Sequence, residues 1–310
     1  MKLYFAPMEG ITNYTFRNAH AEMFGGVDKY YAPFIVPTEN ERISRRTLRD
    51  IVPEYNIAPI VPQVLCNCDV AFAKFTEKIL PLGYDELNIN FGCPASTVVG
   101  KKRGSGALTD TLWLDKLLEK IFENPKITIS VKTRVGFKDH AEFDEILKVY
   151  NKYPISLLIV HPRVREEFYK GTPNIATFEK AYNESNLKLC YNGNIYRVSD
   201  YENIASKFPN TDSIMIGRGA IANPAIFREI RGGAPLKTAE LIAFSKLLEE
   251  RYLALFNSDI YTLQKLKEVW IYALLNFPEE KRIIKAVKKA ARLSDLNSAI
   301  NSLPEITENR

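Results

Sequence analysis

The sequence predicts an α/β fold, a (β/α)8 TIM barrel, followed by an all-α C-terminal helical bundle. Eight short apolar runs recur up to Gly219, and amphipathic helical patterns lie between most of them. From Thr238 onwards, only helical patterns are found. The main alternative is an open, doubly wound sheet. That fold normally has a switch point and often a GxGxxG after an early strand, and the sequence shows neither.

Each predicted strand is a short run of apolar and β-branched residues. The eight strands are predicted at residues 2–8, 27–34, 58–65, 86–92, 127–135, 156–163, 187–193 and 213–219. The clearest helices are predicted at 69–80, 109–122, 140–153 and 174–182, with Asp69, Thr109 and Ser199 as candidate helix caps. The polar segment 37–50 is a weaker helix and is also compatible with a loop that contains one turn.

A change of pattern after Gly219 indicates a second domain. A short helical segment is followed by a hinge rich in Gly and Pro, and three helices are then predicted at 238–256, 263–277 and 278–293. We therefore divide the chain into a barrel, residues 1–232, and a C-terminal helical domain, residues 233–310.

The composition is that of a globular protein, with 46% hydrophobic and 25% charged residues in a chain of 310. No apolar run approaches the roughly 20 residues that a membrane helix needs. The N-terminus is too short for a signal peptide, so we expect a cytoplasmic protein. Four cysteines and three histidines without CxxC or HExxH argue against a disulfide scaffold and against a metal site.

The active site of such a barrel lies at the C-terminal ends of its strands. Lys132 and Arg134 share one predicted strand, and an interior lysine is costly unless it is paired, which favours an anionic ligand. The last two strands end in NGN (192–194) and GRGA (217–220), which supply glycines and backbone amides before helices. Barrels often bind phosphate there, and Arg218 would add a bidentate cation, so we predict a phosphate site.

Cys93 is the candidate for the chemistry itself. It lies between a Gly and a Pro, where the strand in NINFGCP (88–94) breaks into a loop that can present a side chain. Two roles are open, nucleophile and general acid. A nucleophile needs a neighbouring base, whereas a general acid needs only the proton that a thiol of pKa about 8.5 carries at pH 7. The other three cysteines are expected to be small buried residues.

These segments together resemble the tRNA-dihydrouridine synthases, in their bacterial type. The motifs follow one another in the family's order: APMEGITN (6–13), PQ (62–63), LNINFGCP (87–94), GSGA (104–107), VKTRVG (131–136), H-x-R…Y-x-G (161–171), YNGNI (191–195) and MIGRGA (215–220). The resemblance implies an FMN-dependent barrel that reduces one uridine of tRNA to dihydrouridine, with NADPH as the reductant of the flavin.

The resemblance also assigns roles to individual residues. Cys93 would be the general acid, which gives a proton to uracil C5 after hydride from flavin N5 has reached C6. The cofactor would be held by Pro7, Met8, Glu9, Gln63, Lys132 and His161, and its phosphate by Asn192, Gly193, Asn194, Gly217 and Arg218. The target base would be surrounded by Asn90, Arg134 and Tyr169.

RNA contact is predicted for the helical domain. The segment 281–292 carries six cations and no acid, and Lys265 and Lys267 lie in the helix before it. Lys281, Lys285, Lys288, Lys289 and Arg292 fall on the side opposite an apolar stripe. Lys101, Lys102 and Arg103 lie in the loop after Cys93. We expect no membrane contact and a monomeric protein.

Two residues depart from the family pattern, Pro162 after the histidine and Asn194 in place of an acid. Pro162 lacks an N–H and has a fixed φ, so the loop that carries Arg163 is expected to bend differently. Two alternative functions remain open. One is a flavin barrel that acts on a free pyrimidine, similar to dihydroorotate dehydrogenase, and the other is a tRNA-binding protein without catalysis.

Overall fold

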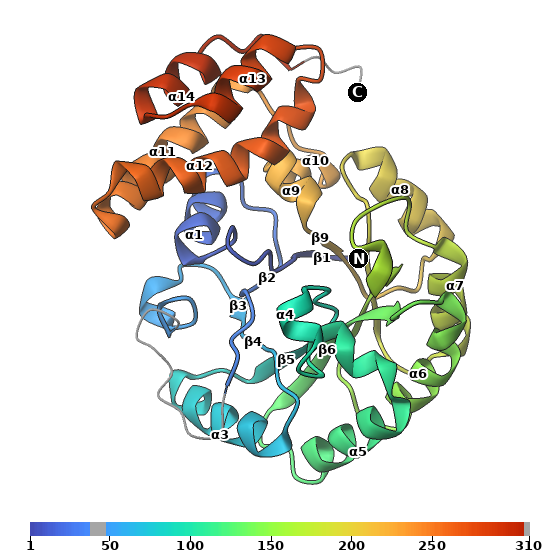
Figure 1. Cartoon of the computed structure of the whole chain (residues 1–310). Coiled ribbons are helices and arrows are strands. Elements are labelled where there is room, and N and C mark those ends of the chain that lie inside the picture. The colour runs from blue at the N-terminus through green and yellow to red at the C-terminus, as the bar shows by residue number, and fades with distance from the viewer. Residues whose placement is uncertain (38–47, 307–310) are drawn as a thin grey trace.

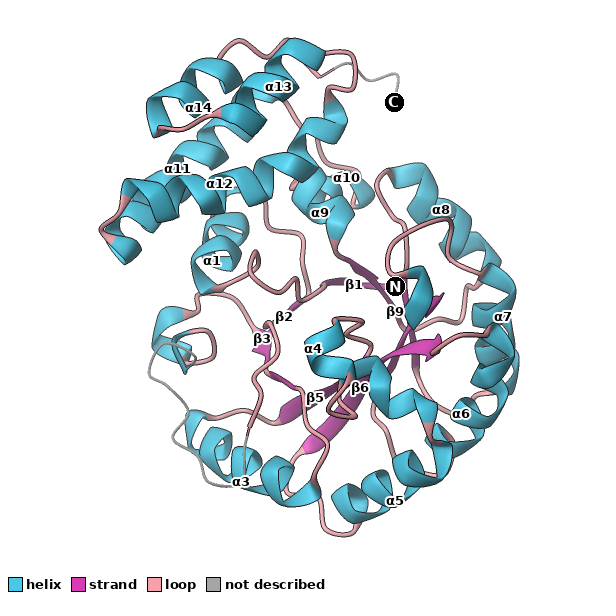
Figure 2. Cartoon of the chain, in the orientation of Figure 1, coloured by secondary structure: helices cyan, strands magenta, loops and turns pink. Residues whose placement is uncertain are grey.

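The computed structural model describes residues 1–37 and 48–306, in which nine parallel strands form one sheet. The strands are β1 (Lys2–Phe5), β2 (Lys29–Tyr31), β3 (Ile60–Val61), β4 (Gln63–Val64), β5 (Glu86–Phe91), β6 (Thr128–Gly136), β7 (Leu158–Val164), β8 (Leu189–Asn192) and β9 (Ser213–Ile216). Their spatial order is β3-β2-β1-β9-β8-β7-β6-β5-β4. The two end strands of this order are neighbours in the chain, so the sheet curls round on itself as a barrel (Figure 2).

The predicted strand 58–65 is divided into β3 and β4 by Pro62. Proline has no N–H to donate to a neighbouring strand, so the ladder is interrupted there. The Pro62 carbonyl still accepts a hydrogen bond from the N–H of Asn88, and Ile35 bridges to Val64 beyond β2. The eight predicted strands therefore correspond to the nine observed ones, and the predicted barrel is confirmed.

Helices surround the strands on the outside of the barrel (Figure 1). They are α1 (Tyr14–Met23), α3 (Asp69–Ile79), α5 (Thr111–Phe122), α6 (Phe143–Tyr150), α7 (Ile175–Glu184) and α8 (Val198–Lys207). The short α4 (Ser96–Val99) follows Cys93 and crosses the centre of the view in Figure 1. Most of the predicted segment 37–50 lies outside the described residues.

The three predicted helix caps are wrong by one or two residues. The cap of α5 is Asp110, whose carboxylate accepts from the N–H of Trp113, while the Thr109 hydroxyl donates to the Gly106 carbonyl instead. Asp69 is the first residue of α3, after Cys68. Helix α8 begins before Ser199, after Arg197. Only at α5 does a neighbouring polar side chain replace the predicted cap, because neither Cys68 nor Arg197 makes a side-chain cap hydrogen bond.

The C-terminal region is entirely helical, as predicted, with α11 (Thr238–Phe256), α12 (Asp259–Ala273), α13 (Lys281–Lys289) and α14 (Leu293–Ile300) in its described part. The short helices α9 (Arg218–Ala222) and α10 (Ile226–Ile230) lead to it from β9. The prediction had three helices, and it missed α14. The prediction also began the second helix four residues late, because Ser258 caps α12.

The helical region packs against the barrel through α11 and α1 (Figure 1). The ring of Phe244 lies edge-on to Phe16, with 5.4 Å between ring centroids, and Trp270 donates to the Ser245 hydroxyl at 2.8 Å. Arg251 of α11 pairs with Glu22 of α1. One continuous cluster of buried apolar residues includes both regions. None of the helices in the described residues has the length and apolar character to cross a membrane.

Candidate active site

A pocket opens where β1, β6, β7, β8 and β9 meet the loops that follow them. It is lined by Ala6, Pro7, Met8, Lys132, His161, Tyr169, Asn192, Gly193, Asn194, Ile195, Tyr196, Gly217, Arg218 and Gly219. Nine of the eleven residues that were predicted to bind a cofactor belong to this lining, and Glu9 and Gln63 do not. Tyr196 is a lining residue that sequence reasoning missed.

Two glycines allow the loops after β8 and β9 to form the pocket wall. A Cβ on Gly193 would lie 2.2 Å from the hydroxyl of Tyr191, and a Cβ on Gly219 would lie 1.7 Å from the carbonyl oxygen of Ile195. Only glycine permits these approaches. The wall is therefore made of closely packed backbone, which is the surface that a phosphate-binding loop offers.

The same end of the pocket is cationic. Arg218 and Arg163 both donate to the Oδ1 atom of Asn194, at 2.8 and 3.2 Å. Asn194 is the position at which the family usually has an acid, and its neutral amide adds no negative charge beside either guanidinium, although the Glu167 carboxylate acts on Arg163. None of the described residues in the lining is acidic. This end therefore attracts an anion.

Lys132 places a further cation in the pocket. Burial, followed by the neighbouring charge of Arg134, lowers the pKa of Lys132 to about 8. Within the described residues, neither a hydrogen bond nor an ion pair is found for its ammonium group. A half-buried cation without a partner is costly, so its position is best explained by an anionic group in the pocket.

His161 is held as a neutral ring. Its Nε2 atom lies 2.9 Å from Nη1 of Arg163, which can only donate, so Nε2 accepts and Nδ1 carries the proton. Burial and the surrounding cations hold the pKa of His161 well below its usual range. Arg163 also donates to the carbonyls of Lys170 and Gly171. This positioning role was not assigned from the sequence, although the H-x-R spacing places both side chains on one face of β7.

Arg134 is buried beneath the mouth. Its guanidinium donates to the carbonyls of Gly92, Val164 and Phe168, at 3.0, 2.9 and 2.6 Å. It joins the loop after β5 to the turn after β7. Tyr169 lies above it, exposed, with its ring centroid 5.4 Å from the Arg134 guanidinium carbon and 4.6 Å from that of Arg218. Of these two predicted base contacts, only the tyrosine faces solvent.

The loop of Cys93 is fixed on both sides. The Asn90 side-chain oxygen accepts from the N–H groups of Gly92 and Cys93, each at 2.9 Å. The backbone N–H and the hydroxyl of Ser105 donate to the Cys93 carbonyl. Gly104 has φ +54°, and a Cβ there would lie 2.7 Å from the same carbonyl oxygen. The GSGA motif therefore closes over the cysteine backbone.

The Cys93 thiol stays protonated near neutral pH. Burial raises the pKa of this half-buried thiol, and the nearby Glu9 carboxylate acts in the same direction. Both effects disfavour the thiolate, which a nucleophile needs, and both favour a proton donor. No histidine is hydrogen-bonded to Cys93 among the described residues. The arrangement is suited to general acid catalysis.

The comparisons with known proteins agree with this site. The family model described as "Dihydrouridine synthase (Dus)" matches residues 4–308. The chain belongs to the dihydrouridine synthase family. This confirms the resemblance that the motifs indicated. Dihydrouridine synthases are flavin-dependent oxidoreductases, so the chain is an enzyme that uses a flavin.

Two curated relatives illustrate the relationship. The "tRNA-dihydrouridine(16) synthase" of Neisseria meningitidis serogroup A / serotype 4A (strain DSM 15465 / Z2491) is 25% identical over an alignment of 285 residues, which covers 87% of this chain and 84% of that protein. The "Probable tRNA-dihydrouridine synthase 2" of Bacillus subtilis (strain 168) is 30% identical over 234 residues, 72% of this chain and 70% of that protein.

Solved structures share the barrel with this dihydrouridine synthase. A mutant of morphinone reductase in complex with tetrahydroNAD superposes with a TM-score of 0.53 at 10% identity, covering 76% of this chain and 87% of the other. Histamine dehydrogenase from Rhizobium sp. 4-9 gives 0.57 at 11% identity, covering 74% of this chain and 45% of the other. At such low identity, the likeness concerns the fold.

The pocket of this dihydrouridine synthase fits a flavin on chemical grounds. Lys132 offers an unpaired ammonium group to an anionic reduced ring, and the glycine wall beside Arg218 offers backbone and cation to a phosphate. Gln63 is fully buried and hydrogen-bonded within the barrel, while Glu9 is exposed at the rim. Neither of these two predicted cofactor contacts lines the pocket, whereas the other nine do.

The two lysines of α12 have separate partners. Lys265 donates to the Gly10 carbonyl at 2.7 Å and pairs with Glu268, which brings the helical region to the loop after β1. Lys267 donates to the Ala290 carbonyl at the end of α13, at 3.0 Å. The structure therefore places Lys265 near the barrel mouth and Lys267 between helices.

Proposed function

We propose that this dihydrouridine synthase acts on tRNA, uses FMN as its flavin and takes its reducing equivalents from NADPH. The observation that carries the proposal is Cys93, a protonated, half-buried thiol on a fixed loop near the cationic pocket. Curated relatives that match over most of their length are named tRNA-dihydrouridine synthases, which supports tRNA as the substrate.

The pocket residues would bind the cofactor and orient it. Bound FMN would supply a hydride to C6 of the uracil ring. Pro7, Met8 and Glu9 would contact the flavin from the loop after β1, Gln63 would hydrogen-bond to its ring, and Lys132 would stabilise negative charge on it. The phosphate would be held by Asn192, Gly193, Asn194, Gly217 and Arg218, with His161 beside them.

Cys93 would complete the reduction as the proton donor. Uracil C5=C6 is conjugated with the C4 carbonyl, so negative charge develops at C5 and O4 when C6 is reduced. The thiol would protonate C5, and solvent would return a proton to the thiolate. Tyr169 would contact the flipped base directly, while Arg134 and Asn90 would support it through the loops that they hold.

We further propose that residues 233–310 form the tRNA-binding domain. Helix α13 offers exposed lysines, and Lys265 and Lys267 lie on the neighbouring α12. Phosphates of RNA would be the partners of these lysines. The enzyme would act as a monomer in the cytoplasm, where tRNA is modified.

The test is position-resolved mass spectrometry of dihydrouridine in tRNA from cells with and without the gene. We expect dihydrouridine to disappear at one position and to return with the wild-type gene. Cys93→Ala should restore none, because loss of a general acid costs about 100- to 10,000-fold in rate. The purified variant should still be yellow with FMN and should still bind tRNA.

Two results would contradict the proposal. An unchanged tRNA profile, together with reduction of free pyrimidines by the purified protein, would show that the substrate is a small molecule. Loss of the yellow cofactor in Cys93→Ala would mean that the cysteine holds the flavin and is not the acid. Restoration of dihydrouridine by Cys93→Ala would assign the proton to another group.

A further inference from the structure

The interior of the barrel contains a column of polar side chains on three neighbouring strands. Glu86, Asn88 and Asn90 alternate along β5, while Leu87, Ile89 and Phe91 belong to the apolar core between sheet and helices. The sheet register places Gln63 of β4 and Ser130 of β6 on either side of Asn88. Barrel interiors are normally filled by branched apolar residues, so this column is unusual.

The column is one continuous chain of hydrogen bonds. It runs from the floor of the barrel to the active-site loop in five links between side chains and a final link to backbone. The links are Lys29 Nζ to Glu86 Oε2 (2.6 Å), Ser130 Oγ to Glu86 Oε1 (2.7 Å), Asn88 Nδ2 to Ser130 Oγ (2.9 Å), Gln63 Nε2 to Asn88 Oδ1 (2.8 Å), Asn90 Nδ2 to Gln63 Oε1 (2.8 Å), and Cys93 N to Asn90 Oδ1 (2.9 Å).

The direction of the chain is forced from both ends. At the floor, the Glu86 carboxylate can only accept, so the Ser130 hydroxyl donates to it and has to accept from Asn88. At the top, the backbone N–H groups of Gly92 and Cys93 can only donate, so Asn90 has to present its oxygen to them. The two ends demand the same orientation of every amide between them.

The orientation of these amides affects stability because their side chains are buried. Gln63, Asn88 and Ser130 have no exposed surface, and Asn90 has 7%. If one side-chain amide rotated by 180°, its NH2 group would face another donor, and no solvent could form a hydrogen bond with either group. A buried polar group without a partner costs about 1–3 kcal/mol. The carboxylate at the floor therefore reinforces, through every amide between, the orientation that the backbone N–H groups of Gly92 and Cys93 impose on Asn90.

We propose that Glu86 and Ser130 are positioning residues for Cys93, which act through Asn88, Gln63 and Asn90 on the backbone that presents the thiol. This inference rests on the proposed role of Cys93 as proton donor. A thiol that is displaced by about 1 Å can lose a factor of 100 in proton transfer. Glu86 lies at the start of β5 and does not line the active-site pocket, so the hydrogen-bond chain is the route by which it would affect the thiol.

Glu86→Gln tests the direction of the chain with almost no change in shape. An amide nitrogen facing the Lys29 ammonium would set two donors against each other, so Gln at this position turns its oxygen to Lys29 and its NH2 group to Ser130. The Ser130 oxygen can accept from this NH2 group and from Asn88 at once, but its own hydrogen then loses its acceptor, so the hydrogen-bond chain either reverses or leaves that buried hydrogen unpaired. Adding Lys29→Met removes this constraint, because the amide oxygen is then free to face Ser130.

The experiment compares wild type, Lys29→Met, Glu86→Gln and the double variant, each as the flavin-loaded full chain. Stopped-flow absorbance follows two half-reactions, flavin reduction by NADPH and reoxidation of the reduced flavin by tRNA. Alkylation of Cys93 by iodoacetamide, resolved by peptide mass spectrometry without tRNA or NADPH, reports the thiol loop directly.

We expect Glu86→Gln to slow reoxidation by tRNA at least about tenfold and to change the Cys93 alkylation rate at least about threefold. Flavin reduction by NADPH should change less than reoxidation, because Cys93 takes no part in it and only the proposed Gln63 contact would be affected. The double variant should recover to within about threefold of Lys29→Met in both reoxidation and alkylation. If Glu86→Gln acted only by breaking the Lys29–Glu86 ion pair, the double variant would show the same reoxidation and alkylation rates as Glu86→Gln. That result would overturn the inference. Reoxidation of Glu86→Gln at the wild-type rate would also overturn it. Failure of wild type to transfer electrons to any tRNA would instead refute the proposed function.

Discussion

At the scale of single residues, Phe168 has the most unusual backbone near the site. It has φ +50° and ψ −100°, a combination that residues with a Cβ rarely adopt. Its carbonyl accepts from the buried Arg134, and its exposed ring lies 5.0 Å from the guanidinium of Arg165, which donates to the Pro94 carbonyl. Two arginines thus tie this strained turn to the Cys93 loop and hold Tyr169 over the mouth.

We therefore predict an inverted order of stability at this position. Phe168→Gly should be more stable than Phe168→Ala by about 1–2 kcal/mol, because only glycine adopts this backbone without strain. At an ordinary exposed position, alanine would be the more stable of the two. Urea unfolding of both variants followed by circular dichroism gives the difference. An alanine variant at least as stable as the glycine variant would mean that the turn stores no strain.

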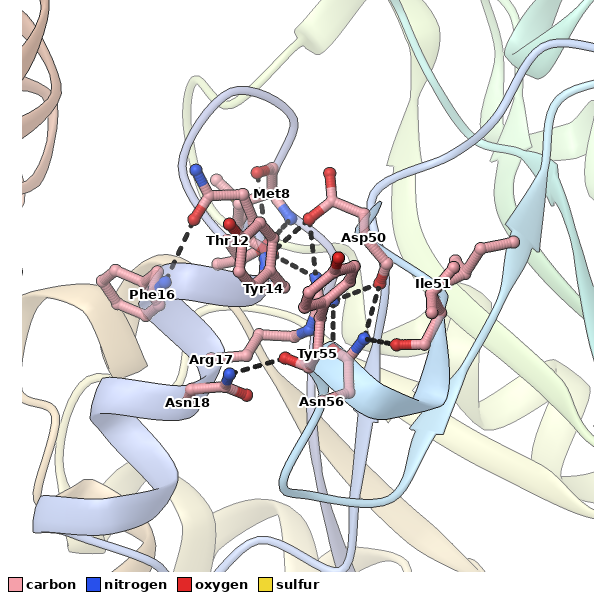
Figure 3. Close-up of polar contacts among 12 residues, drawn as sticks. Met8, Thr12, Tyr14, Phe16, Arg17, Asn18, Asp50, Ile51, Tyr55 and Asn56 are labelled. Carbon is pink, nitrogen blue, oxygen red and sulfur yellow. Dashed lines mark hydrogen bonds and ion pairs between the residues drawn. The ribbon is translucent and has the colours of Figure 1, made fainter. Parts of the chain in front are cut away.

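At the scale of elements, Arg17 of α1 supports the loop that carries Pro7 and Met8. It is fully buried and donates to the carbonyls of Thr12 and Asp50 and to the side-chain oxygen of Asn56 (Figure 3). The Thr12 hydroxyl accepts in turn from the N–H of Met8, at 2.8 Å. The guanidinium thus connects the pocket wall with the segment that precedes β3.

Arg17→Lys should lower the free energy of unfolding by about 2–4 kcal/mol, because a single ammonium group cannot reach all three acceptors and leaves buried oxygens unpaired. Flavin content should fall with it. The matched control is Arg251→Lys, the same chemical change in the half-exposed pair with Glu22, where we expect less than about 1 kcal/mol. Equal losses of unfolding free energy in the two variants, measured by urea unfolding, would show that the hydrogen bonds of Arg17 stabilise the protein no more than the half-exposed ion pair of Arg251.

The helices and strands also show how much of the fold the sequence predicts. Apolar runs and helical periodicity predicted every barrel strand, because burial imposes these patterns directly. The helical periodicity of α12 was not applied when both of its lysines were predicted to contact RNA. Lys265 and Lys267 are two residues apart, about 200° around a helix, so they cannot share one face. The structure accordingly gives them different partners, Gly10 and Ala290.

Other features were missed for two reasons. Helix α14 has only eight residues, and its start signal is local but was not recognised: Asp295 accepts from the N–H groups of Ala291 and Arg292. The second reason is a contact that no local pattern encodes. The buried role of Arg134 requires the turn after β7 to lie against the loop after β5. Sequence spacing placed Arg134 at the mouth, but it could not show that three carbonyls occupy its donors.

At the scale of the whole molecule, the distribution of charge separates two surfaces. The site is cationic inside the barrel, and a second cationic face lies on α13, where Lys281, Lys285, Lys288 and Lys289 are exposed. In the described part of the chain, none of these four lysines forms an ion pair. Val287 and Ala290 are buried beneath them, and Arg292 pairs with Asp295. The apolar stripe was predicted to consist of Ile283, Ile284, Val287, Ala290 and Ala291, and of these only Ala291 is exposed.

We predict that replacing these four lysines of α13 by Gln will weaken tRNA binding at least about tenfold at moderate salt. Binding releases counterions from each phosphate that a lysine neutralises. When a contact is lost, fewer counterions are released, so the magnitude of the slope of log K against log salt should decrease by about one per lysine involved. Flavin content should not change, because the lysines lie outside the pocket. Filter binding across a salt series, with flavin absorbance, measures both quantities.

The matched control removes four positive charges elsewhere, as Lys116→Gln, Lys120→Gln, Lys126→Gln and Lys148→Gln. These lysines lie on or beside α5 and α6, on the part of the barrel opposite the helical region in Figure 1. A general effect of net charge would weaken binding equally in the two sets. If α13 is the surface that contacts RNA, the control should keep the wild-type salt slope while the α13 variant loses most of its own. Equal slopes in both variants would remove α13 from the interface and leave the barrel mouth as the place where tRNA is bound.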